Sequence, residues 1–344
     1  MNMSSIFWLC IYTDMDKPLM DKFNFTIDQS AIQYFGKGLV RPECVITEKD
    51  GSLWTSDGRG GLSHILSDGT QKFIPQRIDG EKVQNSLPNG LAMLKDGSFA
   101  IANMGTRRLE HMSRLGDTSV LCDNFEDTPL GLVNFVLVGP NDNLWFTVST
   151  RRSEFMDGFR HDISDGYIGV YDGKSARIIA NNLSFPNEIR LDPQNEYLYV
   201  AETTGKRIRR FKILDEFQLG EPEHFGPKSL GDGFPDGIAF DEKGNLWVAM
   251  VVAEKVIVIT ADQQVHKIMD DGIPREIRKV ERNFRAGILL REQMAATKGS
   301  IAPLVSSIAF GGENLETVYL GSLAGGQIAS FSSPVAGRPM EHWS

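Results

Sequence analysis

The sequence predicts an all-β fold, a six-bladed β-propeller in which each blade has four strands. Glycine makes up 34 of the 344 residues, above its average share of about 7%, and it is not gathered in low-complexity segments. One hairpin pattern recurs six times, at intervals of roughly 45–70 residues that are typical of propeller blades. Short apolar stretches after each hairpin supply further strands. A ring of small repeated sheets accounts for these observations.

Each repeat begins with a β-hairpin. An apolar stretch leads into a turn rich in Asp, Gly or Asn, and a second apolar stretch that often carries an aromatic residue follows. Glycine and asparagine supply the positive φ angle that such turns require. The second strands begin at Leu53-Trp54, Ser98-Phe99, Leu144-Trp145, Leu198-Tyr199, Leu246-Trp247 and Val318-Tyr319.

Third and fourth strands follow the hairpins. Third strands are expected at Leu62–Leu66, Arg108–Met112, Tyr167–Tyr171, Arg207–Phe211, Val256–Ile259 and Gln327–Phe331. Fourth strands are expected at Lys72–Ile74, Val120–Cys122, Arg177–Ala180 and Val265–Met269. The sixth repeat reaches the end of the sequence before its fourth strand, and Ala31–Phe35 is expected to supply that strand. Closing the ring in this way removes an open sheet edge.

The repeats divide the chain into a leader, one domain and an insertion. Residues 1–30 are expected to form a loosely ordered leader, and residues 31–344 a single propeller. An insertion at about 270–305 separates the fifth and sixth repeats. Within it, residues 282–298 lack proline and precede Gly299, a suitable C-cap, so they are expected to form a helix.

This helix would present an apolar face formed by Phe284, Ile288 and Leu289. The link between a fourth strand and the next first strand lies on the face where the first strands begin. The insertion is therefore expected to form a helical lid or rim over the central channel. A contact between subunits is the competing interpretation, and the oligomeric state is left open.

Charge and cysteine content exclude several classes of function. The 45 acidic residues outnumber the 36 basic ones, which argues against binding to nucleic acid. Three scattered cysteines without a Cys-x-x-Cys spacing indicate a reducing, cytoplasmic setting. The apolar run Ile6–Tyr12 lacks a basic flank and is too short to span a membrane, so no signal peptide and no membrane partner are expected.

One polar residue stands at an equivalent place near the start of each first strand. It lies eleven residues before Trp54, Trp145 and Trp247, and twelve before Tyr199. First strands line the channel of a propeller, so these positions should converge on its axis. They are Glu43, Asn89, Asn134, Asn187, Asp236 and Ser306.

These side chains are all oxygen donors, and two of them are acids. Asn and Asp also favour turns at strand starts, which explains any one position but does not explain Glu43. Two carboxylates facing one axis repel each other unless a cation lies between them. Oxygen ligands select a hard cation, so one divalent metal ion is expected, Ca²⁺ first, with Mg²⁺ and Mn²⁺ behind it. Zn²⁺ stays a lesser alternative, because no histidine spacing typical of zinc is present.

Three stretches carry a resemblance to a known family: Arg41-Pro42-Glu43, Phe185-Pro186-Asn187, and Phe234-Pro235-Asp236-Gly237 with Gly244 to Ala249. They resemble the SMP-30/gluconolactonase/luciferin-regenerating-enzyme family over about residues 31–335. The resemblance implies a six-bladed propeller that binds one divalent metal ion through a Glu, two Asn and an Asp. By position these match Glu43, Asn134, Asn187 and Asp236. Members include sugar-lactone hydrolases, with relatives that cleave organophosphates.

The resemblance implies a metal-dependent hydrolase of the lactonase type, which acts on carboxylic ester bonds of a small-molecule lactone or ester. Asp236 is the candidate general base or nucleophile, and Asn89 is expected to contact the substrate or a water on the metal. Phe135 stands where members often carry Asp, and Leu132 where some carry Arg. Phe135 is therefore also expected to contact the substrate. These departures indicate a more apolar channel and a more hydrophobic lactone or ester.

The loop at residues 149–166 is expected to border the site. Arg151 or Arg152 in this loop is a candidate for binding a substrate carboxylate or lactone oxygen, and a solvated basic loop is the alternative. Two other functions stay open: a calcium-binding propeller that binds a ligand or partner without catalysis, and a metal-dependent esterase or organophosphate hydrolase. The sequence has no Gly-x-Ser-x-Gly motif, which argues against a serine hydrolase.

Overall fold

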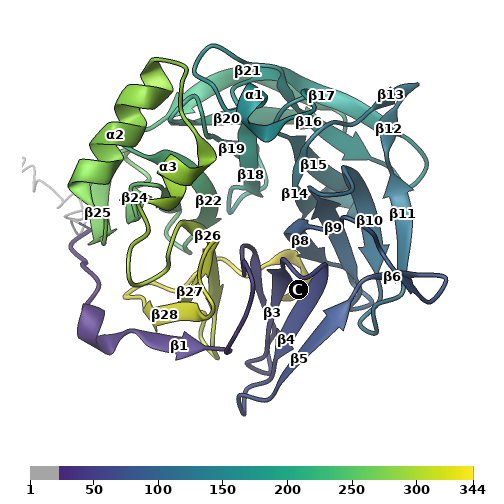
Figure 1. Cartoon of the computed structure of the whole chain (residues 1–344), viewed down its shortest axis with the longest axis horizontal. Helices are drawn as coiled ribbons and strands as arrows, with labels where there is room; N and C mark the ends of the chain where they lie inside the picture. The colour runs from purple at the N-terminus through teal and green to yellow at the C-terminus, as the bar shows by residue number, and fades with distance from the viewer. Residues whose placement is uncertain (1–22, 344) are drawn as a thin grey trace, which may run out of the picture.

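The protein is a six-bladed β-propeller with four-stranded antiparallel blades, as the sequence predicts. A computed structural model describes residues 23–343, and Figure 1 looks down the ring. In blades one to five the chain starts at the innermost strand and moves outward with each turn. The inner strands surround a central channel, because each packs against the inner strands of the neighbouring blades.

The strands of the first five blades, from the inside outward, have the following bounds. Blade one contains β2 (Val45–Thr47), β3 (Leu53–Asp57), β4 (Gly61–Ile65) and β5 (Gln71–Pro75). Blade two contains β8 (Pro88–Met93), β9 (Phe99–Asn103), β10 (Arg108–Met112) and β11 (Thr118–Cys122). Blade three contains β14 (Val133–Val138), β15 (Leu144–Val148), β16 (Gly166–Tyr171) and β17 (Ala176–Leu183). Blade four contains β18 (Pro186–Leu191), β19 (Tyr197–Glu202), β20 (Arg207–Asp215) and β21 (Gln218–Phe225), and blade five contains β22 (Phe234–Phe240), β23 (Leu246–Val251), β24 (Lys255–Ile259) and β25 (Val265–Asp270).

Blade six joins the two ends of the chain. Its strands β26 (Val305–Gly311), β27 (Thr317–Ser322) and β28 (Ile328–Ser332) come from the C-terminal part, and its outer strand is β1 (Gln33–Phe35). β1 pairs antiparallel with β28, with Gln33 opposite Ser330 and Phe35 opposite Ile328. The predicted closure by an N-terminal strand is confirmed.

The expected strands are present, and β21 in blade four is an addition. Its residues alternate poorly between apolar and polar, and most of them are exposed. An outermost strand has one solvated face and little packing, so its hydrophobic pattern is weak. Two short ribbons lie between blades: β6 (Arg77–Ile78) with β7 (Glu81–Lys82), and β12 (Asn124–Phe125) with β13 (Thr128–Pro129). Single turns of 3₁₀-helix occur at η1 (Gln29–Ala31), η2 (Pro140–Asp142) and η3 (Glu341–Trp343).

The hairpin aromatics form the core between blades. Trp54, Trp145 and Trp247 on second strands are among the largest fully buried side chains. The Trp247 ring packs edge-on against Phe310 of blade six, with 5.3 Å between ring centroids. Each blade thus buries its recurring aromatic against a neighbour, which explains why the pattern recurs with the blade period.

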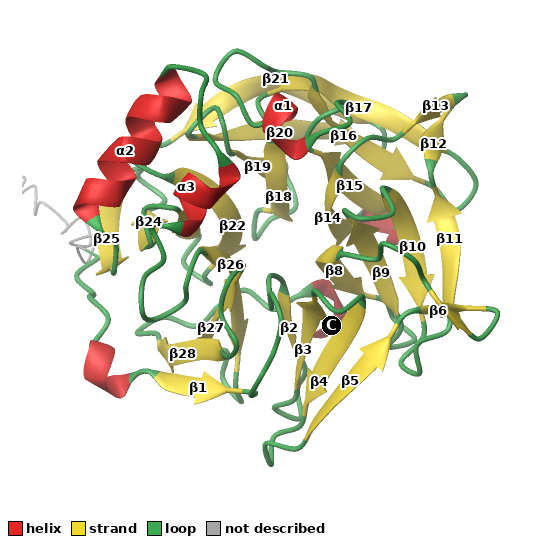
Figure 2. Cartoon of the chain, in the orientation of Figure 1, coloured by secondary structure: helices red, strands yellow, loops and turns green. Residues whose placement is uncertain are grey.

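The insertion folds as two helices rather than one. α2 spans Pro274–Arg285 and α3 spans Arg291–Ala295. The expected bounds of 282–298 are wrong, because the chain leaves the helical path at Gly287, where φ is +68°, and because a proline at the first helical position is favourable. Figure 2 shows α3 between α2 and the centre of the ring. Phe284 and Leu289 are buried as expected, whereas Ile288 is 63% exposed.

The described chain is already packed at Phe23. Residues 1–22 of the expected leader lie outside the described residues. The Ile27 amide donates to the Ile268 carbonyl at 2.9 Å, and the Phe23 ring lies edge-on against Trp247. Phe25 stacks near Phe331 of blade six. Residues 23–30 therefore pack on the outer parts of blades five and six. Among residues 23–343, no helix is long and apolar enough to cross a membrane.

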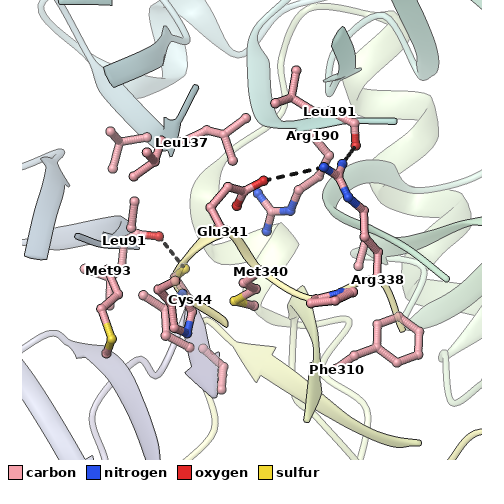
Figure 3. A pocket seen from close by; sticks show the side chains of 18 of the residues that line it. Cys44, Leu91, Met93, Leu137, Arg190, Leu191, Phe310, Arg338, Met340 and Glu341 are labelled. Atoms are coloured by element: carbon pink, nitrogen blue, oxygen red, sulfur yellow. Dashed lines mark hydrogen bonds and ion pairs between the residues drawn. The ribbon is translucent and has the colours of Figure 1, made fainter. Parts of the chain in front are cut away.

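The C-terminal segment crosses the channel at the end where the hairpin turns lie. Met340 lies near Cys44 among the residues that line the channel at this end (Figure 3). Glu341 pairs with Arg338, with 3.9 Å between their charged atoms. Arg338 donates to the Leu191 carbonyl of blade four, and Trp343 donates to the Thr47 carbonyl of blade one. The segment thus ties blades together and covers a pocket of about 60 Å³ at this end.

Candidate functional site

The polar residues at the starts of the inner strands meet at the opposite end of the channel. Five of the six predicted axial positions line one pocket of about 190 Å³. All five side chains belong to residues that are at most 6% exposed. These residues are Glu43, Asn89, Asn134, Asn187 and Asp236. The sixth, Ser306, is buried behind them, and its hydroxyl donates to the Glu43 carbonyl at 3.0 Å.

β-Bulges turn the axial side chains of blades two to six toward the axis, whereas Glu43 lies just before the regularly paired β2. The pairing of β18 with β19 shifts register between Pro186 and Ile189, and β22 shifts likewise between Pro235 and Ile238. β8, β14 and β26 carry irregularities at the same place. A bulge adds a residue on one strand and re-aims its side chains. The bulges therefore place polar residues at the axis, whereas the regular parts of the inner strands stay apolar.

The inner strands approach each other closely at these bulges. A Cβ atom at Gly237 would lie 2.4 Å from both the Ser306 carbonyl oxygen and the Ser307 Cα atom. No L side chain fits in that space, so the glycine after Asp236 is required by packing.

Asn89 connects two of the predicted ligands. Its Nδ2 atom donates to Glu43 Oε1 at 3.1 Å and to the Asn134 backbone carbonyl at 2.9 Å, and it lies 3.2 Å from Asn134 Oδ1. The Arg41 guanidinium donates to Asn89 Oδ1, which fixes the orientation of the carboxamide. Asn89 therefore holds Glu43 and Asn134 in place.

Three buried oxygens at this point have no hydrogen-bond partner within residues 23–343: Glu43 Oε2, Asn187 Oδ1 and Asp236 Oδ1. Leaving a buried acceptor unpaired costs about 1–3 kcal/mol, more for a charged one. Three such atoms from three blades, all facing one pocket, fit a hard divalent cation, for which carboxylate and carboxamide oxygens are the preferred ligands. The predicted ligand residues Glu43, Asn134, Asn187 and Asp236 are thus brought together.

The carboxyl groups at the axis hold protons more tightly than usual. Burial raises the pKa of Glu43 to about 7, against the opposing charge of Arg41. Burial raises the pKa of Asp236 well above its usual range, and the nearby Glu43 and Glu188 add to the shift. Each of these carboxyl groups is therefore expected to ionise fully only when a positive charge compensates it. Among the described residues no group of three His, Cys, Asp or Glu side chains is placed to hold a metal, so a cation bound here would also need the two asparagines as ligands.

Glu188 is a third buried acid, close enough to Glu43 and Asp236 to affect their charges, and sequence reasoning missed it. It follows Asn187, and in a regular strand it would face away from the channel. The bulge in β18 buries it instead beside Arg190, with 2.7 Å between Arg190 and its Oε2 atom. Burial raises the pKa of Glu188 to about 7, against the opposing charge of Arg190. No sequence signal distinguishes this position without knowledge of the bulge.

Apolar side chains form the walls of the pocket. Phe155 belongs to the short helix α1 (Phe155–Gly158), and Phe159 follows it. Their rings stack with centroids 5.4 Å apart, and both pack edge-on against Phe185 at 5.2 Å. Phe159 also contacts Phe234 of β22 and Phe284 of α2, which joins the insertion to the walls. The site therefore has a polar floor and an aromatic side.

The insertion contributes directly to this pocket. Arg291, Met294 and Ala295 of α3 line it together with the axial residues. The expected lid position over the channel is thus consistent with the structure, since α3 borders the site. Arg41 and Arg291 are the two arginines that line the pocket, and sequence reasoning missed both as site residues. Arg41 belongs to the Arg41-Pro42-Glu43 stretch, and this position next to a predicted ligand could have identified it as a site residue. Nothing in the sequence distinguishes Arg291.

Three predicted substrate contacts do not line this pocket. Phe135 follows the bulge in β14, so its ring faces the far pocket, 4.5 Å from the Arg190 guanidinium. Arg151 is exposed and lies over the Tyr167 ring, and Arg152 is exposed 3.8 Å from Asp165. The loop at residues 149–166 directs its phenylalanines inward and its arginines outward, because the apolar side chains gain burial against blade four and α2.

The end of the insertion is tied to the propeller by a buried acid. Glu254 Oε2 accepts the Leu304 amide at 2.8 Å. Burial raises the pKa of Glu254 from 4.5 to about 7, although hydrogen bonds from the Gly299, Leu304 and Val305 amides favour the ionised form. The neighbouring acid Asp271 adds a smaller upward effect. The folded state therefore keeps a proton that the unfolded chain releases at lower pH.

A pH-dependent stability follows from this group. Because the folded pKa is above the unfolded one, the contribution of Glu254 is most favourable below about pH 4.5 and is lost as the pH rises through about 7. The difference in unfolding free energy between Glu254→Gln and wild type should increase as the pH is raised from about 5 to about 8. We expect this increase, in favour of the variant, to reach up to about 2–3 kcal/mol. Urea denaturation at several pH values measures this difference, with the exposed Glu292→Gln as the control. A difference that stays constant with pH would contradict the assignment.

Comparison with known proteins places most of the chain in one group. Residues 41–275 match the family described as SMP-30/Gluconolactonase/LRE-like region. This segment contains Glu43, Asn134, Asn187 and Asp236, and it ends at the start of α2. The match therefore covers the predicted ligands but not α3.

Several curated proteins are similar over parts of the chain. Adipocyte plasma membrane-associated protein of Gallus gallus is 27% identical over 239 residues, 65% of this chain and 56% of that protein. The same protein of Danio rerio is 34% identical over 134 residues, 35% of this chain and 30% of that protein. Protein STRICTOSIDINE SYNTHASE-LIKE 13 of Arabidopsis thaliana is 29% identical over 47% of this chain and 41% of that protein. The chain thus spans less than two thirds of the length of these relatives.

Solved structures share the fold over nearly the whole chain. A luciferin-regenerating enzyme aligns with a TM-score of 0.66 at 18% identity, covering 90% of this chain and 97% of that one. A gluconolactonase from Xanthomonas campestris aligns with a TM-score of 0.63 at 20% identity, covering 88% of each chain. A calcium-binding protein, regucalcin, from Agrobacterium tumefaciens aligns with a TM-score of 0.65 at 16% identity, covering 90% and 98%. At these identities the likeness concerns the fold.

Proposed function

The chain belongs to the SMP-30/gluconolactonase/LRE-like family, and from that membership and the geometry of its axial pocket we propose that it is a metal-dependent hydrolase that opens lactone rings. The observation that carries the proposal is the set of three buried, unpartnered oxygens of Glu43, Asn187 and Asp236 at the floor of the pocket. Oxygen atoms that lack hydrogen-bond donors and lie close together are suited to binding a cation. Such a cation could also coordinate an oxygen of the substrate.

Glu43, Asn134, Asn187 and Asp236 would hold one divalent ion, for which Ca²⁺ is our first candidate. When bound, such an ion polarises a carbonyl and makes a water molecule more acidic. The two asparagines are neutral, so the four ligands offset no more than the two positive charges. Asn89 holds Glu43 and Asn134 in position through its Nδ2 atom. Arg41 in turn orients Asn89.

Asp236 is the proposed general base. Its carboxylate accepts a proton from the water that attacks the lactone carbonyl. The proton then passes to the ring oxygen as the carbon–oxygen bond breaks, so that the product is a hydroxy acid. The phenylalanines beside the floor exclude other water and pack against the apolar part of the ring. Cys44 and Cys122 are both free thiols, which supports the proposal of a cytoplasmic setting.

Metal removal tests the proposal. We expect a chelator to abolish hydrolysis of a panel of lactones and Ca²⁺, Mg²⁺, Mn²⁺ or Zn²⁺ to restore it. Metal at about 100 times its Kd should also raise the unfolding free energy by about 2.7 kcal/mol. Both effects should be absent in Glu43→Gln, whose fold is checked by circular dichroism.

The same panel separates the alternatives. It includes acyclic esters and organophosphates beside sugar lactones and alkyl lactones. Stabilisation by metal without turnover of any compound would contradict the proposal and favour a non-catalytic calcium-binding propeller. Turnover of esters or organophosphates in the absence of lactone hydrolysis would favour the esterase or organophosphate hydrolase. Hydrolysis that continues unchanged in the chelator would exclude a role for the metal in the reaction.

A further inference from the structure

The pocket combines two guanidinium groups with apolar walls. Arg41 and Arg291 both line it, and the rest of the wall above the floor is largely apolar. A neutral polyol needs many hydrogen-bond partners in its site, and these walls offer few. An apolar molecule without charge, in turn, would offer the guanidinium group of Arg291 no acceptor. The lining therefore favours a ligand that is both anionic and apolar.

The two arginines differ in the partners that they have within the protein. Arg41 donates to the Pro88 carbonyl and to Asn89 Oδ1, so its guanidinium is part of the floor. Arg291 is the first residue of α3 and is exposed. In the part of the chain that the structure describes, no carboxylate lies within 4.0 Å of its nitrogens. Its guanidinium instead lies 5.4 Å from the centre of the Phe155 ring. Arg291 therefore has its planar donors available for a ligand.

The charge of the site also favours an anion. Glu43 and Asp236 balance Arg41 and Arg291 when no other ion is counted. If the two acids serve as metal ligands, a divalent ion leaves two positive charges in excess, and a ligand carboxylate would offset one of them. Arginine binds a carboxylate through two parallel N–H donors, and this geometry is stronger and more specific than a single contact.

We propose that the substrate of this pocket is a lactone or ester that carries a carboxylate on an apolar body, with the carboxylate held by Arg291 and the apolar body packed against Phe155, Phe159 and Met294. The proposal rests on the proposed function and names its substrate class. It moves the carboxylate-binding role from Arg151 and Arg152, where the sequence places it, to an arginine of the insertion. α3 would thus determine specificity, and the axial residues would perform the chemistry.

Binding measurements test the proposal without turnover. Isothermal titration calorimetry compares 4-phenylbutyrate, its neutral amide 4-phenylbutyramide, and acetate, each with the metal-free and the Ca²⁺-loaded protein. We expect wild type to prefer phenylbutyrate over the amide by about tenfold or more, the factor that corresponds to ~1.4 kcal/mol from a charge-assisted contact. Acetate should bind much more weakly, because it lacks the apolar body.

Variants assign the effect to Arg291. Arg291→Gln should lose the preference for phenylbutyrate, and Arg291→Lys should keep part of it. Phe155→Leu should weaken binding of the acid and of the amide alike. Arg275→Gln is the matched control, because Arg275 lies on α2, is 91% exposed and does not line the pocket. Equal affinity for acid and amide in wild type, or equal losses in Arg275→Gln and Arg291→Gln, would overturn the proposal.

Kinetics separate this inference from the proposed reaction. If lactones are hydrolysed, the KM of a carboxylate-bearing aryl lactone should rise about tenfold in Arg291→Gln with kcat little changed, and the KM of its neutral methyl ester should stay the same. Lactone hydrolysis with no such difference would reject the substrate class and leave the reaction standing. Arg291-dependent binding of phenylbutyrate without any hydrolysis would reject the reaction and leave the binding site standing.

Discussion

Asp236→Asn is expected to lower kcat for lactone hydrolysis by about 10²–10⁴-fold, the range that a positioned general base contributes. Asparagine keeps the size of the side chain and an oxygen for a metal ligand, but it does not accept the proton of the attacking water. The assay is run at saturating metal, so that weaker metal binding does not imitate the loss. A kcat within about threefold of wild type under these conditions would reject Asp236 as the base and leave it a ligand.

Stability measurements distinguish a loss of catalysis from a loss of folding. Because burial holds the pKa of Asp236 well above its usual range, the ionised side chain is unfavourable in the metal-free folded protein. Above neutral pH, metal-free Asp236→Asn should therefore be at least as stable as metal-free wild type. Asp232→Asn provides a matched control, since Asp232 is an exposed carboxyl four residues upstream. This control should keep both activity and stability.

Glu281→Ala is expected to destabilise the protein by about 3–5 kcal/mol, the cost of breaking a buried ion pair on one side. Glu281 of α2 is 5% exposed and accepts from Lys206 Nζ with both carboxylate oxygens, at 2.5 and 2.7 Å. It also accepts the Gly233 amide at 2.9 Å. Its loss leaves a charged lysine without its acid, over the rings of Phe234 and Phe284.

A double-mutant cycle measures the interaction energy between Lys206 and Glu281. Lys206→Met alone should cost a similar amount, and the double variant should cost clearly less than the sum, because neither charge is then left unpaired. Arg285→Ala is the control: Arg285 lies 3.9 Å from the same carboxylate but is 76% exposed, and exposed pairs contribute about 0–1 kcal/mol. Additive effects of the two variants, or an equal loss in Arg285→Ala, would contradict a buried anchor for α2.

The ion pair between Lys206 and Glu281 is also expected to affect ligand binding in the pocket, because it holds α2 in place. α2 carries Phe284, which packs on Phe159 and Phe234 at the side of the site. Because α3 follows α2 and supplies Arg291, loosening α2 should also weaken the anion preference that Arg291 provides. Hydrolysis of neutral lactones, which we propose to depend on the axial residues, should be reduced less.

The repeat pattern is sufficient to predict the propeller. The hairpin aromatics, the turn residues and the third strands recur with one period, and each depends on local chemistry or on packing against the adjacent blade. The strand missed in blade four, β21, is an outer strand without a buried face, so no hydrophobic pattern marks it. The helix bounds in the insertion differ from the expected ones because no repeated pattern constrains that segment.

The axial residues are also found from the sequence, because each stands at a constant distance from a hairpin aromatic. What that counting does not supply is where neighbouring side chains point. Glu188 is buried beside Arg190 because a bulge breaks the strand alternation, and Phe135 lies outside the pocket for the same reason. Arg151 and Arg152 have the right charge in the right loop, but the loop folds with its phenylalanines inward.

The sequence by itself therefore determined the six-bladed ring, its closure by β1 and the convergence of Glu43, Asn134, Asn187 and Asp236. Only the tertiary structure decided that Glu188 is buried beside Arg190, that α1 and α3 line the pocket, and that Arg291 rather than Arg151 lies next to it. The physical reason is the range of the interactions. Blades repeat and pack on adjacent blades, so their rules are local and recur in the sequence, whereas the pocket walls come from loops and an insertion whose direction is set by burial against distant segments.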